Sequence, residues 1–527
     1  MTPPRPFALL APALVLSVLS LNAPALHAQD SGAPLSAIGW LDQALAAPVP
    51  GPPPPETRDI PPRPDLAPPA FDSEPIATTP LDASGIDSTG LFTAERIGLP
   101  RSLWGAAPLP EILSAIASLP DDTMPTANRL ALRLLMAEFA PPWQLAAEDQ
   151  GKLLLARVDA LIGLGALEQA GQLIEATPER TSALSARAFD IALLLGEEDR
   201  ACDQMSGRIA TTYGHGAQIF CTARRGNWQA AHSALNVARS LGLIDRDEST
   251  LLLRFLEEEE DEFLLPPPQR ITPLIWRIME ALGDPVTTAT LPVAFAHADL
   301  RGTSGWRAQL DAAERLTRAG VMQPNRLLGL YTQRRAAASG GLWERVRIIQ
   351  ALDQAIAADD MARVSAALVQ AWSLFAAVEL EQALAEMTAE TLASLPLTGE
   401  GAEALWKLLL LSQEHAERAA ELAPETSLGR FIMTLAQGDD LPSSTAHDMA
   451  NAIALAFEGA DLPDTAQSQI SAGMPGLVVL DGLRQIADAA AGDLQAATRG
   501  LQRLRALGLE QTARQVGIEL LLLERRG

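Results

Sequence analysis

Apolar residues recur with helical spacing through most of the chain after residue 86. Leu154, Val158, Leu161 and Gly165 follow one another at intervals of four, three and four positions, which places them on one face of a helix. Ala, Leu, Glu and Arg favour helices, whereas strand-favouring aromatic residues make up only 4% of the 527 residues. The pattern predicts an all-α protein.

Glycines punctuate this helical pattern regularly. Gly165, Gly196 and Gly226 recur at an interval of about 30 residues, and an alanine follows each of them five positions later. A helix of about 12 residues, a turn, a second helix and a turn fill such a period. Glycine adopts the left-handed conformation that ends a helix, and alanine lets neighbouring helices approach closely. The period predicts helical-hairpin repeats, an α-solenoid.

A distant pair of segments supports the hairpin unit. Residues 226–243 (GNWQAAHSALNVARSLGL) and 492–509 (GDLQAATRGLQRLRALGL) are identical at nine of 18 positions, at an offset of 266. In the first segment we expect one buried apolar face, made of Trp228, Ala231, Leu235, Ala238 and Leu241. The offset is about half the chain, so an old duplication stays an open alternative to matches that the Ala- and Leu-rich composition favours.

Residues 1–85 have a different character. Residues 1–28 are typical of a secretory signal peptide, with Arg5 before an apolar stretch and small residues after it. A membrane anchor is the alternative, but the stretch is shorter than about 20 residues and Pro12 interrupts it. Residues 29–85 carry 13 prolines between Pro48 and Pro80, which predicts a disordered, Pro-rich linker.

Proline- and glycine-rich breaks divide the helical part. The breaks include 266–268, 283–292, 339–341 and 459–476. We therefore expect a first helical-repeat lobe over 86–265, a connecting segment over 266–292 and a second helical-repeat lobe over 293–527.

Hairpins of this size resemble the tetratricopeptide-like α-solenoid repeats, although the full repeat consensus is absent. Several phrases look like those of a family of exported helical proteins from Gram-negative bacteria: GLPRSLW at 98–104, TPL at 272–274, EALG at 280–283, SGGLW at 339–343 and GLEQTA at 508–513. The resemblance implies an exported helical fold and no catalytic residues. Some members are labelled antifreeze glycopeptide-like, but such peptides resemble tandem Ala-Ala-Thr, which this chain has only in isolated cases.

The chain has two cysteines, Cys202 and Cys221. In an exported protein an even pair favours a disulfide over a metal site or a nucleophile. We expect them on consecutive antiparallel helices, 197–210 and 217–225, joined by the glycine-rich turn 213–216. Their midpoint lies near that turn, so the Cα atoms are expected to approach to the distance that a disulfide needs. Two buried unpaired thiols are the alternative.

The formal charge of −25 disfavours nucleic acid and anionic lipid as partners. The most unusual local feature is an acidic run: Glu257, Glu258, Glu259, Glu260, Asp261 and Glu262. It is a candidate binding patch for a basic partner segment; the alternative is a solvated helix end.

The sequence contains no recognisable catalytic, metal or cofactor motif. None of the six histidines stands at a zinc-ligand spacing, and no G-x-S-x-G elbow occurs. The G-x-G-x-x-A match at 399–404 lacks the preceding strand of a dinucleotide site. Tryptophans 104, 143, 228 and 406 are expected in the core; for Trp104 and Trp143, which stand next to Gly or Pro, the alternative is a ring that covers a loop or stays exposed for a partner.

These observations favour a non-enzymatic periplasmic helical-repeat protein, a scaffold or adaptor that binds a protein partner. The expectation includes no cofactor and no membrane span after signal cleavage. The alternative is a cell-wall-active enzyme or an accessory factor of a peptidoglycan hydrolase. The oligomeric state stays open.

Overall fold

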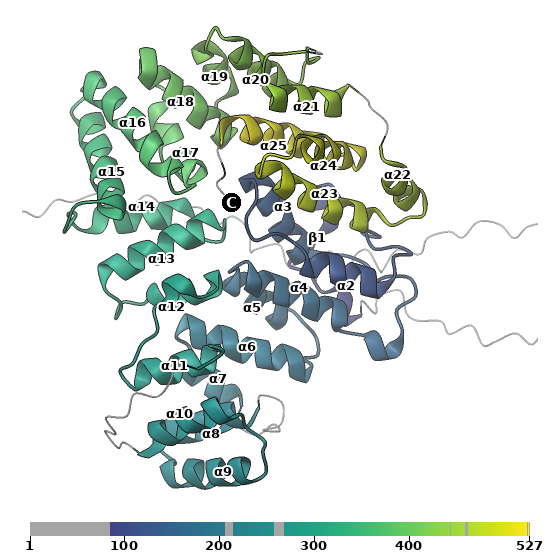
Figure 1. The fold of residues 1–527 in the computed structure, drawn as a ribbon, viewed down its shortest axis with the longest axis vertical. Helices are drawn as coiled ribbons and strands as arrows, with labels where there is room; N and C mark the ends of the chain where they lie inside the picture. Colours follow the sequence, from purple (N-terminus) through teal and green to yellow (C-terminus); the bar gives the residue numbers. More distant parts are fainter. Residues whose placement is uncertain are drawn as a thin grey trace, which may run out of the picture. The chain divides into compact units, whose positions relative to one another are not determined.

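The computed structural model describes residues 85–205, 214–257, 268–442, 444–458, 462–523 and 525. These residues all belong to one compact unit. They form 24 α-helices, α2 to α25, and the only strands among them are β1 (Phe92–Thr93) and β2 (Ala137–Glu138), which pair in parallel. The predicted all-α class is confirmed (Figure 1). The predicted signal peptide and nearly all of the predicted linker lie outside the described residues.

The helices follow one another along the whole unit. The first half of the unit contains α2 (Leu109–Ala117), α3 (Pro125–Met136), α4 (Lys152–Gly163), α5 (Leu167–Glu175), α6 (Ser182–Leu195), α7 (Glu198–Gln204), α8 (His215–Arg224), α9 (Trp228–Ser240), α10 (Arg246–Glu257), α11 (Pro273–Ala281) and α12 (Ala296–Asp299).

The second half contains α13 (Trp306–Arg318), α14 (Pro324–Gln333), α15 (Gly341–Ala357), α16 (Met361–Ala376), α17 (Glu381–Leu392), α18 (Gly399–Ser412), α19 (Ala416–Leu422), α20 (Ser427–Gln437), α21 (Asp448–Phe457), α22 (Asp464–Ser471), α23 (Pro475–Ala490), α24 (Leu494–Ala506) and α25 (Glu510–Leu522). In the part of the chain that the structure describes, none of these helices has the length and apolarity to cross a membrane.

The predicted glycine stops are present. Gly165, Gly196 and Gly226 lie between consecutive helices with φ of 83°, 78° and 81°, values that residues with a side chain rarely adopt. The alanines five positions later are buried: Ala170, Ala201 and Ala231. The repeated pattern therefore marks a turn and the close helix contact that follows it.

Helices near the start and near the end of the unit pack against each other. Figure 1 shows α3 beside α23 and α25, and α2 packs against α23 as well. The backbone N–H of Gly476 donates to the carbonyl of Leu103 at 2.9 Å. A Cβ at Gly476 would lie 2.6 Å from the ring of Trp104, so only glycine fits beneath this indole.

A buried carboxyl group joins α3 to α25. Glu519 is fully buried, and its two oxygens accept hydrogen bonds from the backbone N–H of Thr126 at 3.0 Å and from the Thr126 hydroxyl at 2.5 Å. Burial raises the pKa of Glu519 to about 7. Elsewhere in the core, Arg525 contacts the buried carboxylate of Glu381 at 3.1 Å. The pairing of Thr126 with Glu519 joins polar groups 393 residues apart in sequence.

The apolar core falls into two clusters. The larger one runs from Ala94 to Leu523, and the smaller one, from Phe189 to Ile278, is formed by α6 to α11. Helix α6 contributes to both, since Leu184 and Leu194 belong to the larger cluster and Phe189 and Leu193 to the smaller. Helix α11 does the same, with Trp276 in the larger cluster and Ile275 in the smaller, so the two clusters meet along these two helices.

Two of the four tryptophans expected in the core are there. Trp104 and Trp406 are buried, but Trp143 is 68% exposed and Trp228 is 43% exposed. For these two the expectation is wrong. The ring of Trp143 lies beside Gly473 in the loop before α23. Trp228 is the first residue of α9, and its ring contacts that of Phe255.

The raised pKa of Glu519 predicts that the free energy of unfolding depends on pH. The folded-state pKa, about 7, lies above the usual value of 4.5, so between about pH 4.5 and 7 the unfolded chain loses this proton while the folded chain keeps it. The free energy of unfolding should therefore fall by up to about 3 kcal/mol as pH rises through this window. Glu519→Gln imitates the protonated carboxyl and should lose this part of the dependence.

The measurement is urea unfolding of wild type and Glu519→Gln from pH 4 to 8. The stability of the variant relative to wild type should rise with pH by about that amount. Parallel pH curves for the two proteins would show that Glu519 does not titrate as its burial predicts.

Candidate functional site

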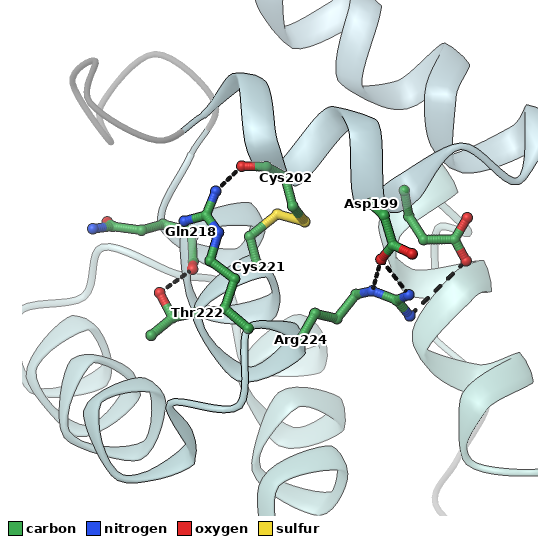
Figure 2. The surroundings of a disulfide bond; sticks show 8 residues. Asp199, Cys202, Gln218, Cys221, Thr222 and Arg224 are labelled. Carbon is green, nitrogen blue, oxygen red and sulfur yellow. Dashed lines mark hydrogen bonds and ion pairs between the residues drawn. A yellow bond between two sulfur atoms is a disulfide. The ribbon is translucent and has the colours of Figure 1, made fainter.

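The predicted disulfide between Cys202 and Cys221 is confirmed. The cysteines lie on the consecutive helices α7 and α8, with Cα atoms 5.2 Å apart, and both are buried in the smaller core cluster. Figure 2 shows the bond between these two helices. Helix α7 ends at Gln204, earlier than the predicted 210, and residues 206–213 lie outside the described residues.

Charged groups surround the disulfide and tie α7 to its neighbours. The Arg224 guanidinium contacts Asp199 at 2.6 Å and Glu198 at 4.0 Å, and Arg225 donates to the carbonyl of Cys202 (Figure 2). The buried Glu198 also pairs with Arg277 of α11. Because these charged groups pair with one another beside the bond, the disulfide has the surroundings of a structural crosslink.

The candidate acidic patch is described only at its first residue. Glu257 ends α10, is exposed and contacts His232 of α9 at 3.1 Å. Glu258, Glu259, Glu260, Asp261 and Glu262 lie outside the described residues. The binding role of the acidic run stays a prediction.

A cavity of about 540 Å³ opens between α5, α6 and α7 on one side and α12 and α14 on the other. Its apolar wall includes Leu167, Ile174, Ile191, Leu195 and Leu300. The residues that line it come from sequence positions 167 to 326, and they include no Ser, Thr, Cys, Tyr, Lys or Asp. The lining therefore offers apolar contact and charge but no hydroxyl, thiol or amine nucleophile.

Four arginines and three glutamates carry the charge of this cavity. Arg200 pairs with Glu175 and Glu197, and Arg326 lies 3.9 Å from Glu168. The other two arginines of the lining are Arg180, which is exposed, and Arg301, which stacks 5.3 Å over the Trp276 ring and pairs with Glu280 outside the lining. Although the whole chain has a charge of −25, arginines outnumber acidic residues in this lining.

His297 is the one buried titratable group of the cavity lining. Its Nε2 lies 2.7 Å from the carbonyl oxygen of Gly165, so Nε2 carries the proton and donates. Burial lowers the pKa of His297, which keeps the imidazole neutral at pH 7. The charge of the cavity at neutral pH therefore comes from the guanidinium and carboxylate groups alone.

One group of metal-ligating side chains was not expected from the sequence. Glu390, Glu414 and His415 bring their ligand atoms within 4.8 Å of one another, and the two glutamates are exposed. Glu390 lies on α17, whereas Glu414 and His415 lie just before α19, so no local motif signals the group. The distance from His415 Nε2 to Glu390 Oε2 is 3.5 Å.

No protein-family profile matches the chain, and neither the curated proteins nor the solved structures give a match.

The disulfide predicts a local effect on stability. Replacing both cysteines by alanine removes a bond that spans 19 residues. In the chain-entropy model this should lower the free energy of unfolding by about 3 kcal/mol. Because the bond lies in the smaller core cluster, hydrogen exchange should accelerate in α7 to α10 and stay unchanged in α15 to α18.

Mass spectrometry of exchanged peptides measures this directly. Intact mass of wild type after alkylation without reductant is the control, and it should show no alkylated cysteine. Equal acceleration throughout the unit would contradict a local role for the bond.

Proposed function

We propose that this chain is a non-enzymatic helical-repeat scaffold that works in the periplasm and binds a protein partner. The cavity between α5, α6, α7, α12 and α14 is the observation that carries the proposal. It joins an apolar wall to a rim of guanidinium groups, on a stack of helices from separate hairpins. Such a surface suits a partner segment with apolar side chains and a carboxylate.

Two features support the periplasmic location. Residues 1–28 are typical of a signal peptide, and a disulfide joins the only two cysteines of the chain. Disulfides persist in oxidising compartments and are rare in the cytosol.

The chemistry of the cavity favours binding over turnover. General acid–base catalysis needs a titratable group within hydrogen-bond reach of a reacting atom. The imidazole of His297 is instead buried and donates its Nε2 proton to a backbone carbonyl, and Arg200 holds Glu175 and Glu197 in ion pairs. The exposed Arg180, and Arg326, which lies 3.9 Å from Glu168, remain as the groups able to hold a ligand.

A charge reversal in the cavity tests the proposal. The double variant Arg180→Glu and Arg326→Glu puts negative charge on the rim and should weaken capture of the partner at least about tenfold, since charge-assisted hydrogen bonds are lost. The measurement is crosslinking in intact cells, followed by pulldown of the tagged protein and quantitative mass spectrometry.

Arg363→Glu is the matched control, because Arg363 is 79% exposed on α16 and is not part of the cavity lining. It should leave capture unchanged. Identical partner sets for wild type and the double variant would refute binding at this cavity.

A further inference from the structure

A separate cavity, of about 210 Å³, lies where early, middle and late parts of the larger core meet. Its lining comes from α3 and the loop before it, the end of α13, the start of α14, α17, and Arg525 beyond α25 (Figure 1). It shares no lining residue with the cavity between α5, α6, α7, α12 and α14. Such a volume has room for about seven waters, or for one molecule with roughly that number of non-hydrogen atoms.

Four side chains of this lining have a buried oxygen atom with no hydrogen-bond partner among the described residues: Thr123, Asn128, Thr317 and Gln382. They are half of the eight buried side-chain nitrogen and oxygen atoms that lack a partner in the described part of the chain. Asn128 and Thr317 are only 6% and 7% exposed. A buried polar group without a partner costs free energy, so this concentration around one cavity indicates a polar ligand.

The two amide side chains present acceptors. The side-chain NH₂ of Asn128 donates to the carbonyl of Ala319 at 2.8 Å. The NH₂ of Gln382 donates to the carboxylate of Glu386 at 2.9 Å and to the carbonyl of Leu411 at 3.2 Å. These bonds fix the orientation of both amides, so the atoms without a partner are the two amide oxygens. A ligand of this cavity must therefore bring N–H or O–H donors.

The lining contains equal numbers of guanidinium and carboxyl groups: Arg129, Arg318, Arg525, Asp122, Glu379 and Glu386. Arg129 pairs with Glu386 at 2.8 Å. Arg525 pairs with Glu381, outside the lining, at 3.1 Å. The third guanidinium group, that of Arg318, is exposed at the end of α13. The cavity therefore balances positive and negative charge, and Arg318 is the cation at its rim.

Two carboxyl groups lie close enough to each other to interact. Burial, and after it the negative charge of Glu379, raises the pKa of Asp122. The guanidinium groups of Arg525 and Arg318 act in the opposite direction but do not cancel the rise. The surroundings of these carboxyl groups therefore favour an additional positive charge.

Helix ends of both signs face the cavity. Helices α3 and α14 begin there, at Pro125 and Pro324, and α17 begins just after Leu380. In none of the three does the N-cap side chain accept a backbone hydrogen bond. Helix α13 ends there, at Thr317 and Arg318. The positive dipole ends favour a carboxylate and the negative end favours an ammonium group, so the cavity suits a ligand that carries both.

We propose that this cavity binds one free α-amino acid. Its ammonium group has three N–H donors, which match the oxygens of Asn128, Thr317 and Gln382. Asn128 and Thr317 lie at the end of α13, because Asn128 donates to the Ala319 carbonyl there. The ammonium group is therefore placed where the negative dipole end of α13 stabilises it.

The rest of the amino acid has partners in the same lining. Its carboxylate accepts from Arg318 in a charge-assisted hydrogen bond. An apolar side chain contacts Met322, Leu380 and Ala383, which are buried. A sugar also brings donors, but it leaves the charged groups of the cavity without partners. The ligand joins parts of the chain that lie far apart in sequence, so its binding stabilises the larger core.

Thermal unfolding of the full chain tests the proposal, with each of the standard L-amino acids at about 5 mM. At least one should raise the midpoint of unfolding, and calorimetric titration should then give a Kd on the order of 10 to 100 µM. The analogues of that amino acid without its amino group, or without its carboxyl group, should bind at least about tenfold more weakly. No effect of any amino acid, or binding of D-glucose in their place, would overturn the proposal.

Thr317→Val separates binding from folding. It removes a hydroxyl that has no partner among the described residues, so the midpoint of unfolding should not fall, whereas the affinity for the amino acid should fall at least about tenfold. Arg318→Gln, at an exposed position, should weaken binding to a similar degree.

Thr388→Val is the matched control. Thr388 is also a buried threonine, but it lies outside the lining and its hydroxyl donates to the carbonyl of Leu384. This variant should bind the amino acid as wild type does. Wild-type affinity in both Thr317→Val and Arg318→Gln would place the amino acid elsewhere and refute binding at this cavity.

Discussion

The contact between α3 and α25 is the constraint on which the larger core depends. In an open array of helical repeats each unit touches only its neighbours, and the end units need polar outer faces. Here the helices near the two ends of the described unit cover each other instead. The buried Glu519 carboxyl, bonded to Thr126, sits at this junction. Gly476, which admits the Trp104 ring against α23, lies at the same junction.

The smaller core cluster is stabilised in a different way. Among the described residues, helices α7 to α10 do not pack on α3 or α25, and α6 and α11 join them to the rest of the unit. A small core buries little apolar area per residue, so a covalent crosslink contributes more there. The disulfide between Cys202 and Cys221 lies in this cluster, which also contains the buried face of α9.

The sequence predicted what is local. Helical periodicity, glycine stops and the spacing of two cysteines around a turn each depend on a stretch of about one repeat, and the structure confirms them. The hydrogen bonds between Thr126 and Glu519, which close the larger core, join positions 393 residues apart. In the sequence, Glu519 looks like any polar residue of an amphipathic helix, so this contact could not be predicted. Trp228 and Leu241 fitted an apolar helix face, but they stand at its two ends and are exposed, as is Leu494, the residue of α24 equivalent to Trp228. The lining of the cavity comes from five helices, so the spacing of residues along the sequence did not predict it either.

Closure of the larger core is tested most directly by hydrogen exchange in a chain that ends at Gly508, which lacks α25. In a closed unit, α3 loses the helix that covers Thr126, so its amides should exchange at least about tenfold faster, while α15 and α16, which do not pack on α25, keep their protection. In an open array only the sequence neighbours of α25 would respond. Unchanged protection of α3, with faster exchange confined to α20 to α24, would contradict the account.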